Sequence, residues 1–112
     1  DFLERVLHGE ASIWELTQFY VDDICKGGEI VPLLLRIAEV EGRRGDLNDD
    51  AELTTRLSGR RYWDVEREIG RMAEQLIFFV LGGAKQLNIS TPEELPNWIR
   101  GRVEKQIRES IR

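Results

Sequence analysis

One apolar series constrains what this chain can fold into more than any other feature of its sequence. Its members are three or four positions apart, and they are Val65, Ile69, Met72, Leu76, Phe79, Gly83 and Leu87. This spacing places all of them on one stripe of a single helix, predicted over about residues 62–86. A stripe with a near-heptad period is typical of a helix that packs lengthwise against other helices, in the same chain or in a second copy.

The rest of the chain also predicts helices, separated by turn residues. Ser12 and Glu15 form the pattern of a capping box at a helix start, and Gly27-Gly28 and Gly45 are helix stops. The segment after Gly28 is apolar on most sides, which predicts a central helix covered by its neighbours. Besides the long helix, we expect helices over residues 1–8, 13–26, 30–40, 49–57 and 97–112, a loop over 45–50 and a turn over 91–94.

These elements predict an all-α fold class. We expect a compact helical bundle of five to six helices, with the helix over about residues 62–86 at its centre and a second subunit packed against it. A chain of 112 residues suits one domain, so residues 1–112 are expected to form a single unit. Because the chain begins at Asp1 and not at Met, residues upstream are expected to be missing.

Cysteine content and hydropathy bear on the compartment. The single cysteine, Cys25, cannot form an internal disulfide, which favours the reducing cytoplasm, and it is predicted to be a small buried hydrophobe. The longest uncharged apolar run, Leu76–Ala84, is less than half of the roughly 20 residues that a membrane-spanning helix needs. We therefore expect no membrane association.

Charge is distributed unevenly along the chain. Residues 1–55 carry 5 Lys and Arg against 13 Asp and Glu, whereas residues 56–112 carry 11 against 8. The two halves are therefore expected to pack against each other, within one chain or between subunits. The net charge of −5 argues against a dedicated nucleic-acid binder, because phosphate contacts dominate the affinity of such proteins. A nucleic-acid-binding regulator remains a second alternative, with Arg60, Arg61, Arg100, Arg102, Lys105 and Arg108 as contacts and Trp98 as a stacking residue.

Few residues suit catalysis or cofactor binding. A nucleophilic site would have to join the single histidine, His8, to Cys25, and zinc lacks ligands, so we assign no catalytic residue, cofactor or metal. Two arginine pairs beside glycines are the best candidates for contacting phosphates or an acidic partner, since guanidinium groups bind such anions in bidentate fashion. They are Arg43-Arg44 and Arg60-Arg61.

The order of elements resembles the all-helical nucleotide pyrophosphohydrolases of the MazG type, over about residues 15–105. The resemblance rests on Leu76–Ile89, an apolar helix followed by a short turn, and on the helical tail after it. That family binds Mg²⁺ through EExxE on one helix and ExxD on the next, where this chain has Ala38-Glu39-Val40-Glu41 and Arg71-Met72-Ala73-Glu74. Neither string fits, so the resemblance implies at most Glu39, Glu41 and Glu74 as ligands. The correctly spaced pair Asp64 and Glu68 could join them in an enzyme.

The leading hypothesis is a non-enzymatic helical module that self-associates, with a dimer favoured, and binds a protein partner. Its interface would be formed by Val65, Ile69, Met72, Leu76, Phe79 and Gly83. The first alternative is a divergent Mg²⁺-dependent pyrophosphohydrolase with the five carboxylates above as ligands.

Overall fold

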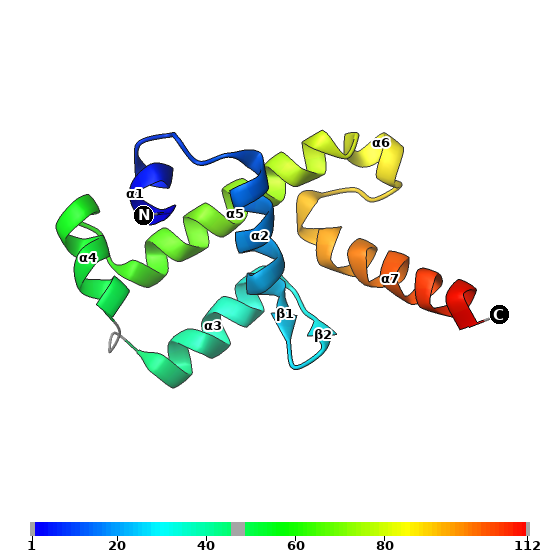
Figure 1. Ribbon diagram of the computed structural model, residues 1–112, viewed down its shortest axis with the longest axis horizontal. Coiled ribbons are helices and arrows are strands. Elements are labelled where there is room, and N and C mark those ends of the chain that lie inside the picture. Colours follow the sequence, from blue (N-terminus) through cyan, green and yellow to red (C-terminus); the bar gives the residue numbers. More distant parts are fainter. Residues whose placement is uncertain (1, 46–48, 112) are drawn as a thin grey trace.

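The central element of the fold is α5 (Tyr62–Val80), against which α2 (Ile13–Ile24), α3 (Leu33–Arg44) and α4 (Asp49–Ser58) all pack (Figure 1). The computed structural model describes residues 2–45 and 49–111. The remaining elements are α1 (Phe2–Leu7), β1 (Cys25–Lys26), β2 (Glu29–Ile30), α6 (Gly83–Leu87), the 3-10 helix η1 (Pro92–Glu94) and α7 (Leu95–Ile111). The predicted helical bundle with a long central helix is confirmed, and the second subunit stays a prediction.

Helix ends follow the local signals in the sequence. The Ser12 hydroxyl accepts the N–H of Glu15 at 3.1 Å, and the Glu15 carboxylate accepts the N–H of Ser12 at 3.3 Å, so the predicted capping box is present. Gly45 ends α3 with a φ of +57° and donates its N–H to the Glu41 carbonyl at 2.8 Å. Of the predicted loop over residues 45–50, residues 46–48 lie outside the described residues, and α4 already begins at Asp49.

The core lies between α2, α3 and α5. Its buried members are Leu16, Tyr20, Ile24, Leu33, Ile37, Trp63, Val65, Ile69, Ala73, Ile77, Leu87 and Leu95. At Gly70 the two helices α3 and α5 approach so closely that a Cβ would lie 2.9 Å from Leu33 Cδ2. The prediction that α3 is covered on most sides was wrong, because it packs on one face only and leaves Leu34 and Leu35 exposed.

The predicted helix over residues 62–86 ends early, at Val80. Gly82 takes a φ of +112°, which L side chains rarely adopt, and the chain then starts the separate helix α6. The Gly82 N–H bonds to the Phe79 carbonyl at 3.0 Å, so the backbone turns instead of continuing as an α-helix. Gly83 and Leu87 therefore do not continue the apolar stripe of α5.

A β-hairpin follows α2, where the sequence predicted helix to Lys26. Cys25 pairs with Ile30 in antiparallel register, and Gly27 and Gly28 have φ values of +54° and +87°. A two-residue loop with positive φ at both positions matches the twist of a hairpin, and glycine adopts it at little cost. The prediction of a buried Cys25 was also wrong, because the hairpin leaves this cysteine exposed.

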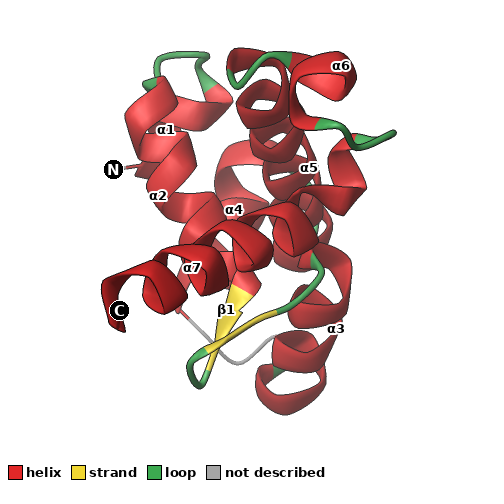
Figure 2. Cartoon of the chain, turned by 90° about the vertical axis from the view of Figure 1, so that its right-hand side faces the viewer, coloured by secondary structure: helices red, strands yellow, loops and turns green. Residues whose placement is uncertain are grey.

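Helix α7 gives the molecule its elongated shape. Leu95 and Pro96 are buried, but α7 then passes the hairpin (Figure 2) and projects from the body (Figure 1), and every residue from 101 to 111 is exposed. The extents are 51 × 28 × 23 Å and the radius of gyration is 15.4 Å, against about 13 Å for a compact chain of this length. Within residues 2–45 and 49–111, the helices are too short or too polar to cross a bilayer.

Candidate functional site

The predicted interface stripe of α5 is split between core and solvent. Val65 and Ile69 are buried, whereas Met72, Leu76 and Phe79 are exposed, Phe79 by 80%. The next residues along the chain, Ala73 and Ile77, face the core instead, about 100° further around the helix. The helix thus presents two apolar faces.

Two exposed apolar surfaces result from this arrangement. The first, which we call the α5 end, comprises Met72, Leu76, Phe79, Val80 and Leu81. The second, the α7 arm, is the projecting part of α7 from residue 101 to residue 111, with apolar residues at every fourth position. The exposed fractions of Val103, Ile107 and Ile111 rise from 44% through 54% to 78% toward the C-terminus. The sequence predicted this helix as amphipathic, and in the described chain the hairpin beside Val103 and Ile107 covers its apolar face only in part.

A groove separates the α7 arm from the hairpin. It has a volume of about 480 Å³ and lies between residues 28–31 and the α7 residues Arg100, Val103, Glu104 and Ile107. The Arg100 guanidinium donates a hydrogen bond to the Ile30 carbonyl and fastens the base of α7 to β2. We call this feature the hairpin groove.

Glu39, the first predicted magnesium ligand, lies among three cations. Its carboxylate pairs with Arg36, with Arg43 at 2.9 Å and with Lys26 at 3.6 Å. Burial alone would raise the pKa of Glu39, but the hydrogen bond from Arg36 and the charges of Arg43 and Lys26 together lower it. Its charge is therefore already balanced by the chain's own side chains.

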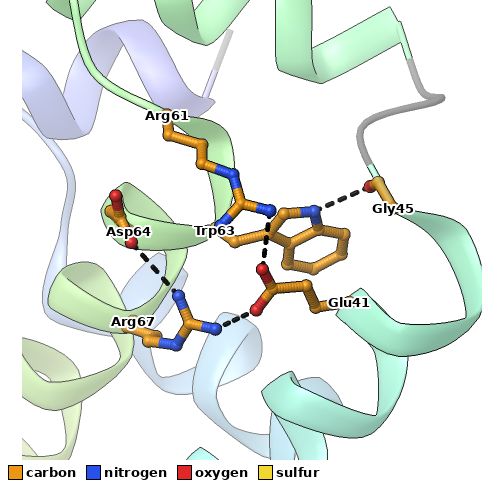
Figure 3. A network of polar contacts seen from close by, with 6 residues as sticks. All are labelled: Glu41, Gly45, Arg61, Trp63, Asp64 and Arg67. Carbon is orange, nitrogen blue, oxygen red and sulfur yellow. Dashed lines mark hydrogen bonds and ion pairs between the residues drawn. The ribbon is translucent and has the colours of Figure 1, made fainter.

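Glu41 and Asp64 belong to a network that joins the end of α3 to the start of α5 (Figure 3). Glu41 accepts from Arg61 at 2.7 Å and from Arg67, and Arg67 also reaches Asp64 at 3.2 Å. Beside them the Trp63 indole N–H donates to the Gly45 carbonyl at 2.7 Å. This network has an evident structural role, since it joins α3 to α5, two helices that α4 separates along the chain.

The two remaining predicted ligands also have partners. Glu68 pairs with Arg60 at 2.5 Å on the surface of α5. Glu74 is buried and accepts the hydroxyl of Tyr20 from α2, and burial raises the pKa of both groups. In the described ranges, no three His, Cys, Asp or Glu side chains are grouped so as to hold a metal ion. The structure does not bring the five carboxylates together.

The basic residues proposed for anion contact are also largely engaged. Arg43, Arg60 and Arg61 pair with carboxylates as described above, so of the two arginine pairs only Arg44 has no ion pair among the contacts found for the described residues. The Arg102 guanidinium lies 5.5 Å from the centre of the Trp98 ring, where it occupies a face that a nucleic-acid base would need. These contacts weaken the nucleic-acid alternative.

Sequence reasoning missed one polar cavity. It has a volume of about 380 Å³ and lies between α2, α3 and α5, with Asp23 and Glu66 on its wall beside arginines of α3. Burial, and then the neighbouring charges of Glu66 and Asp22, raise the pKa of Asp23 to about 8. Its Oδ2 is buried and accepts no hydrogen bond from the described part of the chain. One signal was available, because Asp23 follows the buried Tyr20 by three positions and so shares its face of α2.

The arrangement offers two kinds of chemistry: apolar surfaces that another helix could cover, and one cavity whose carboxyl group holds a proton at neutral pH. Most of the other candidate charges neutralise one another. No family model, curated protein or solved structure matches this chain.

Proposed function

We propose that this chain is a non-enzymatic helical module that acts by self-association and by binding a protein partner. The α7 arm is the observation that carries the proposal. Its apolar residues recur every fourth position, yet all of residues 101–111 are exposed. An isolated helix of this length is marginal in water, so the arm gains stability only when another surface covers its apolar face.

Surface area supports the same proposal. The chain exposes 7615 Å², whereas a compact monomer of 13.0 kDa exposes about 6,300 Å² by surface scaling. The excess of roughly 1,300 Å² exceeds the approximately 800 Å² that each partner buries in a standard protein interface. The excess exposed area of each chain is therefore large enough to form the interface of a stable dimer.

The α5 end is the other surface open to a partner. Phe79 is 80% exposed, and a protruding aromatic side chain is the type of residue that anchors protein interfaces. This surface contains three members of the predicted interface, Met72, Leu76 and Phe79. A protein partner is therefore preferred over nucleic acid, and the cytoplasm remains the proposed compartment.

Sedimentation equilibrium of the wild type over a range of concentrations tests the proposal. We expect the mass of a dimer, reduced toward that of a monomer by Leu76→Asp with Phe79→Asp, by Ile107→Asp, or by both sets. Gln75→Asp is the matched control, because it adds the same charge to α5 at a position that is already polar and exposed. A wild type that remains monomeric at every concentration would contradict self-association.

Mg²⁺-dependent hydrolysis of nucleotides is a second candidate function, with a different residue set from the predicted one. One observation favours it: the cavity at Asp23 and Glu66 is lined by the guanidinium groups of Arg36, Arg43 and Arg44, which suit phosphate, and a bound Mg²⁺ ion would have to displace the proton of Asp23. Release of pyrophosphate from a panel of nucleoside triphosphates would test it. Turnover should be lost in Asp23→Asn and kept in Glu68→Gln, whereas absence of turnover with every nucleotide would eliminate this candidate.

A further inference from the structure

We infer that the hairpin groove of one chain receives the α7 arm of a second copy, and that the exchange is reciprocal. The inference rests on the proposed self-association and names the surface that performs it. Two copies would then be related by a two-fold axis, and each arm would leave its own body to lie against the partner's hairpin.

The groove and the arm have matching apolar surfaces. Ile30 and Val31 line one side of the groove, and Val103 and Ile107 line the other. The incoming arm would bring the same Val103 and Ile107, followed by Ile111. Because these residues belong both to the groove and to its occupant, the two α7 helices would pack against each other antiparallel. A surface that is complementary to itself in this way is what a two-fold dimer requires.

The charges of the two surfaces are of opposite sign. The arm carries Arg102, Lys105 and Arg108 against Glu104 and Glu109, so its net charge is positive. The groove is lined by Glu104 and Arg100 of α7 and by Glu29, the carboxylate that the hairpin contributes to the rim, so its net charge is negative. An arm placed in the partner's groove would bring its cations toward this carboxylate and toward the acidic first half of the partner chain, which favours that pairing over other partners.

Exposed area sets the scale of the interface. The exposed area exceeds that of a compact monomer by roughly 1,300 Å², and burial of about 800 Å² per chain would form an interface of standard size. The groove, at about 480 Å³, has room for several aliphatic side chains. Reciprocal packing of two arms would therefore bury an area within the excess that each chain exposes, and its side chains would fit the volume of the groove.

The first experiment measures the dimer dissociation constant by sedimentation equilibrium. Ile107→Asp should weaken the dimer at least 100-fold, because it places a charge in the apolar contact of both arms. Gln106→Asp is the matched control, since it adds the same charge about 100° around α7 and outside the groove, and should change the constant by less than about threefold. Circular dichroism and thermal unfolding verify that both variants fold, as expected for a residue that is half exposed.

The second experiment uses charge reversal to identify the groove as the occupied surface. Chains with Glu29→Lys have a basic groove and a basic arm, and chains with Arg102→Glu and Arg108→Glu have an acidic groove and an acidic arm. Each chain alone should dimerise at least tenfold more weakly than the wild type, because every mismatch occurs twice across the two-fold axis. Mixed together they should form a heterodimer of near wild-type affinity, since both arm-to-groove contacts then join opposite charges.

The outcomes separate this inference from the proposed function. A monomeric wild type would overturn both. A wild-type dimer that survives Ile107→Asp, or a mixture of the two charge variants that forms no heterodimer, would overturn arm exchange and leave self-association through the α5 end. Restoration on mixing, together with loss of the dimer in Ile107→Asp alone, would support arm exchange.

Discussion

Helices α5 and α7 carry apolar residues at the same three- or four-residue spacing, but they meet different surroundings. In α5 one face is enclosed by α2, α3 and α4, while Met72, Leu76 and Phe79 lie outside that enclosure. In α7 only the first turns are covered, and the arm has no neighbour within the described chain that buries it. Hydrophobic periodicity therefore predicts a helix and its apolar face, whereas the chain's other elements decide whether that face is covered.

The same contrast extends to polar groups. The body buries Tyr20 against Glu74 and encloses one oxygen of Asp23 that accepts no hydrogen bond from the described residues, whereas the charges of the arm are exposed. Polar substitutions in the body should therefore change the free energy of unfolding strongly. Similar substitutions in the arm should change association instead.

The largest expected effect comes from placing a charge on each helix. Ala73→Asp puts an unpaired carboxylate at a fully buried position of α5 and should destabilise the fold by at least about 4 kcal/mol. Ile107→Asp on the arm should change the free energy of unfolding of the single chain by about 0.5 kcal/mol or less. Urea unfolding at low protein concentration measures both. Equal losses of stability would show that the arm belongs to the same cooperative core.

A pH series should distinguish the buried carboxyl of the body. The ordinary pKa of Asp23 is 3.8 and folding raises it to about 8, so across this window the unfolded chain has lost the proton while the folded chain keeps it. Native stability therefore falls as pH rises between these values. Asp23→Asn should remove this loss and be more stable than the wild type at pH 7 by on the order of 2 kcal/mol.

Chemical unfolding across the same pH range provides the measurement. Glu10→Gln is the matched control, because Glu10 is exposed and lies outside the cavity that contains Asp23. The control should follow the pH dependence of the wild type. A pH dependence in Asp23→Asn as steep as that of the wild type would assign the effect to another group.

An intermediate effect is expected at the buried hydroxyl of α2. Tyr20→Phe leaves the Glu74 carboxyl group buried without its donor and should cost about 1–3 kcal/mol of unfolding free energy. Adding Glu74→Leu should recover part of that loss, because neither polar partner then remains. Thermal or urea unfolding of the single and double variants gives the comparison, and simple additivity of the two losses would argue against the contact.

The smallest expected effect compares two helical glycines. Gly101→Ala in the arm should stabilise α7 by up to about 1 kcal/mol, because an added Cβ meets nothing within 4 Å. Gly70→Ala brings the same gain in helix propensity, but its Cβ lies 2.9 Å from Leu33 Cδ2, and overpacking of this kind costs about 1–3 kcal/mol. Helical content by circular dichroism, with unfolding midpoints, should rise for the first variant and not for the second.

Much of the fold could be predicted where a local signal acts within a few residues. The capping box at Ser12 and the glycine stop at Gly45 appear as expected. Prediction failed where glycines allow two outcomes: Gly82 turns the chain out of the long helix, and Gly27-Gly28 forms a hairpin loop instead of a simple stop. In both cases the positive φ of glycine decides, and sequence spacing alone does not reveal it.

The candidate site was less predictable, because side-chain partners come from distant parts of the chain. Glu41 is far in sequence from Arg61 and Arg67, and Glu74 is far from Tyr20. Carboxylates that could bind a metal ion, judged from the sequence alone, are therefore paired with arginines or lysine, or buried, in the folded chain. The stripe residues from Val65 to Phe79 were correctly predicted to share one helix, whereas Gly83 and Leu87 lie in α6. Which side of α5 faces the core depends on α2 and α3, and the stripe itself does not encode their positions.

The 51 Å length of the chain has a hydrodynamic consequence. A body this long experiences more friction than a sphere of its mass, so a single copy should elute early from a gel-filtration column. Reciprocal arm exchange would fold each protruding helix between two bodies, so the frictional ratio should fall as the mass doubles. Association of two copies end to end would raise the frictional ratio instead. Sedimentation velocity therefore distinguishes an arm-exchanged dimer from an end-to-end dimer, in addition to distinguishing a dimer from a monomer.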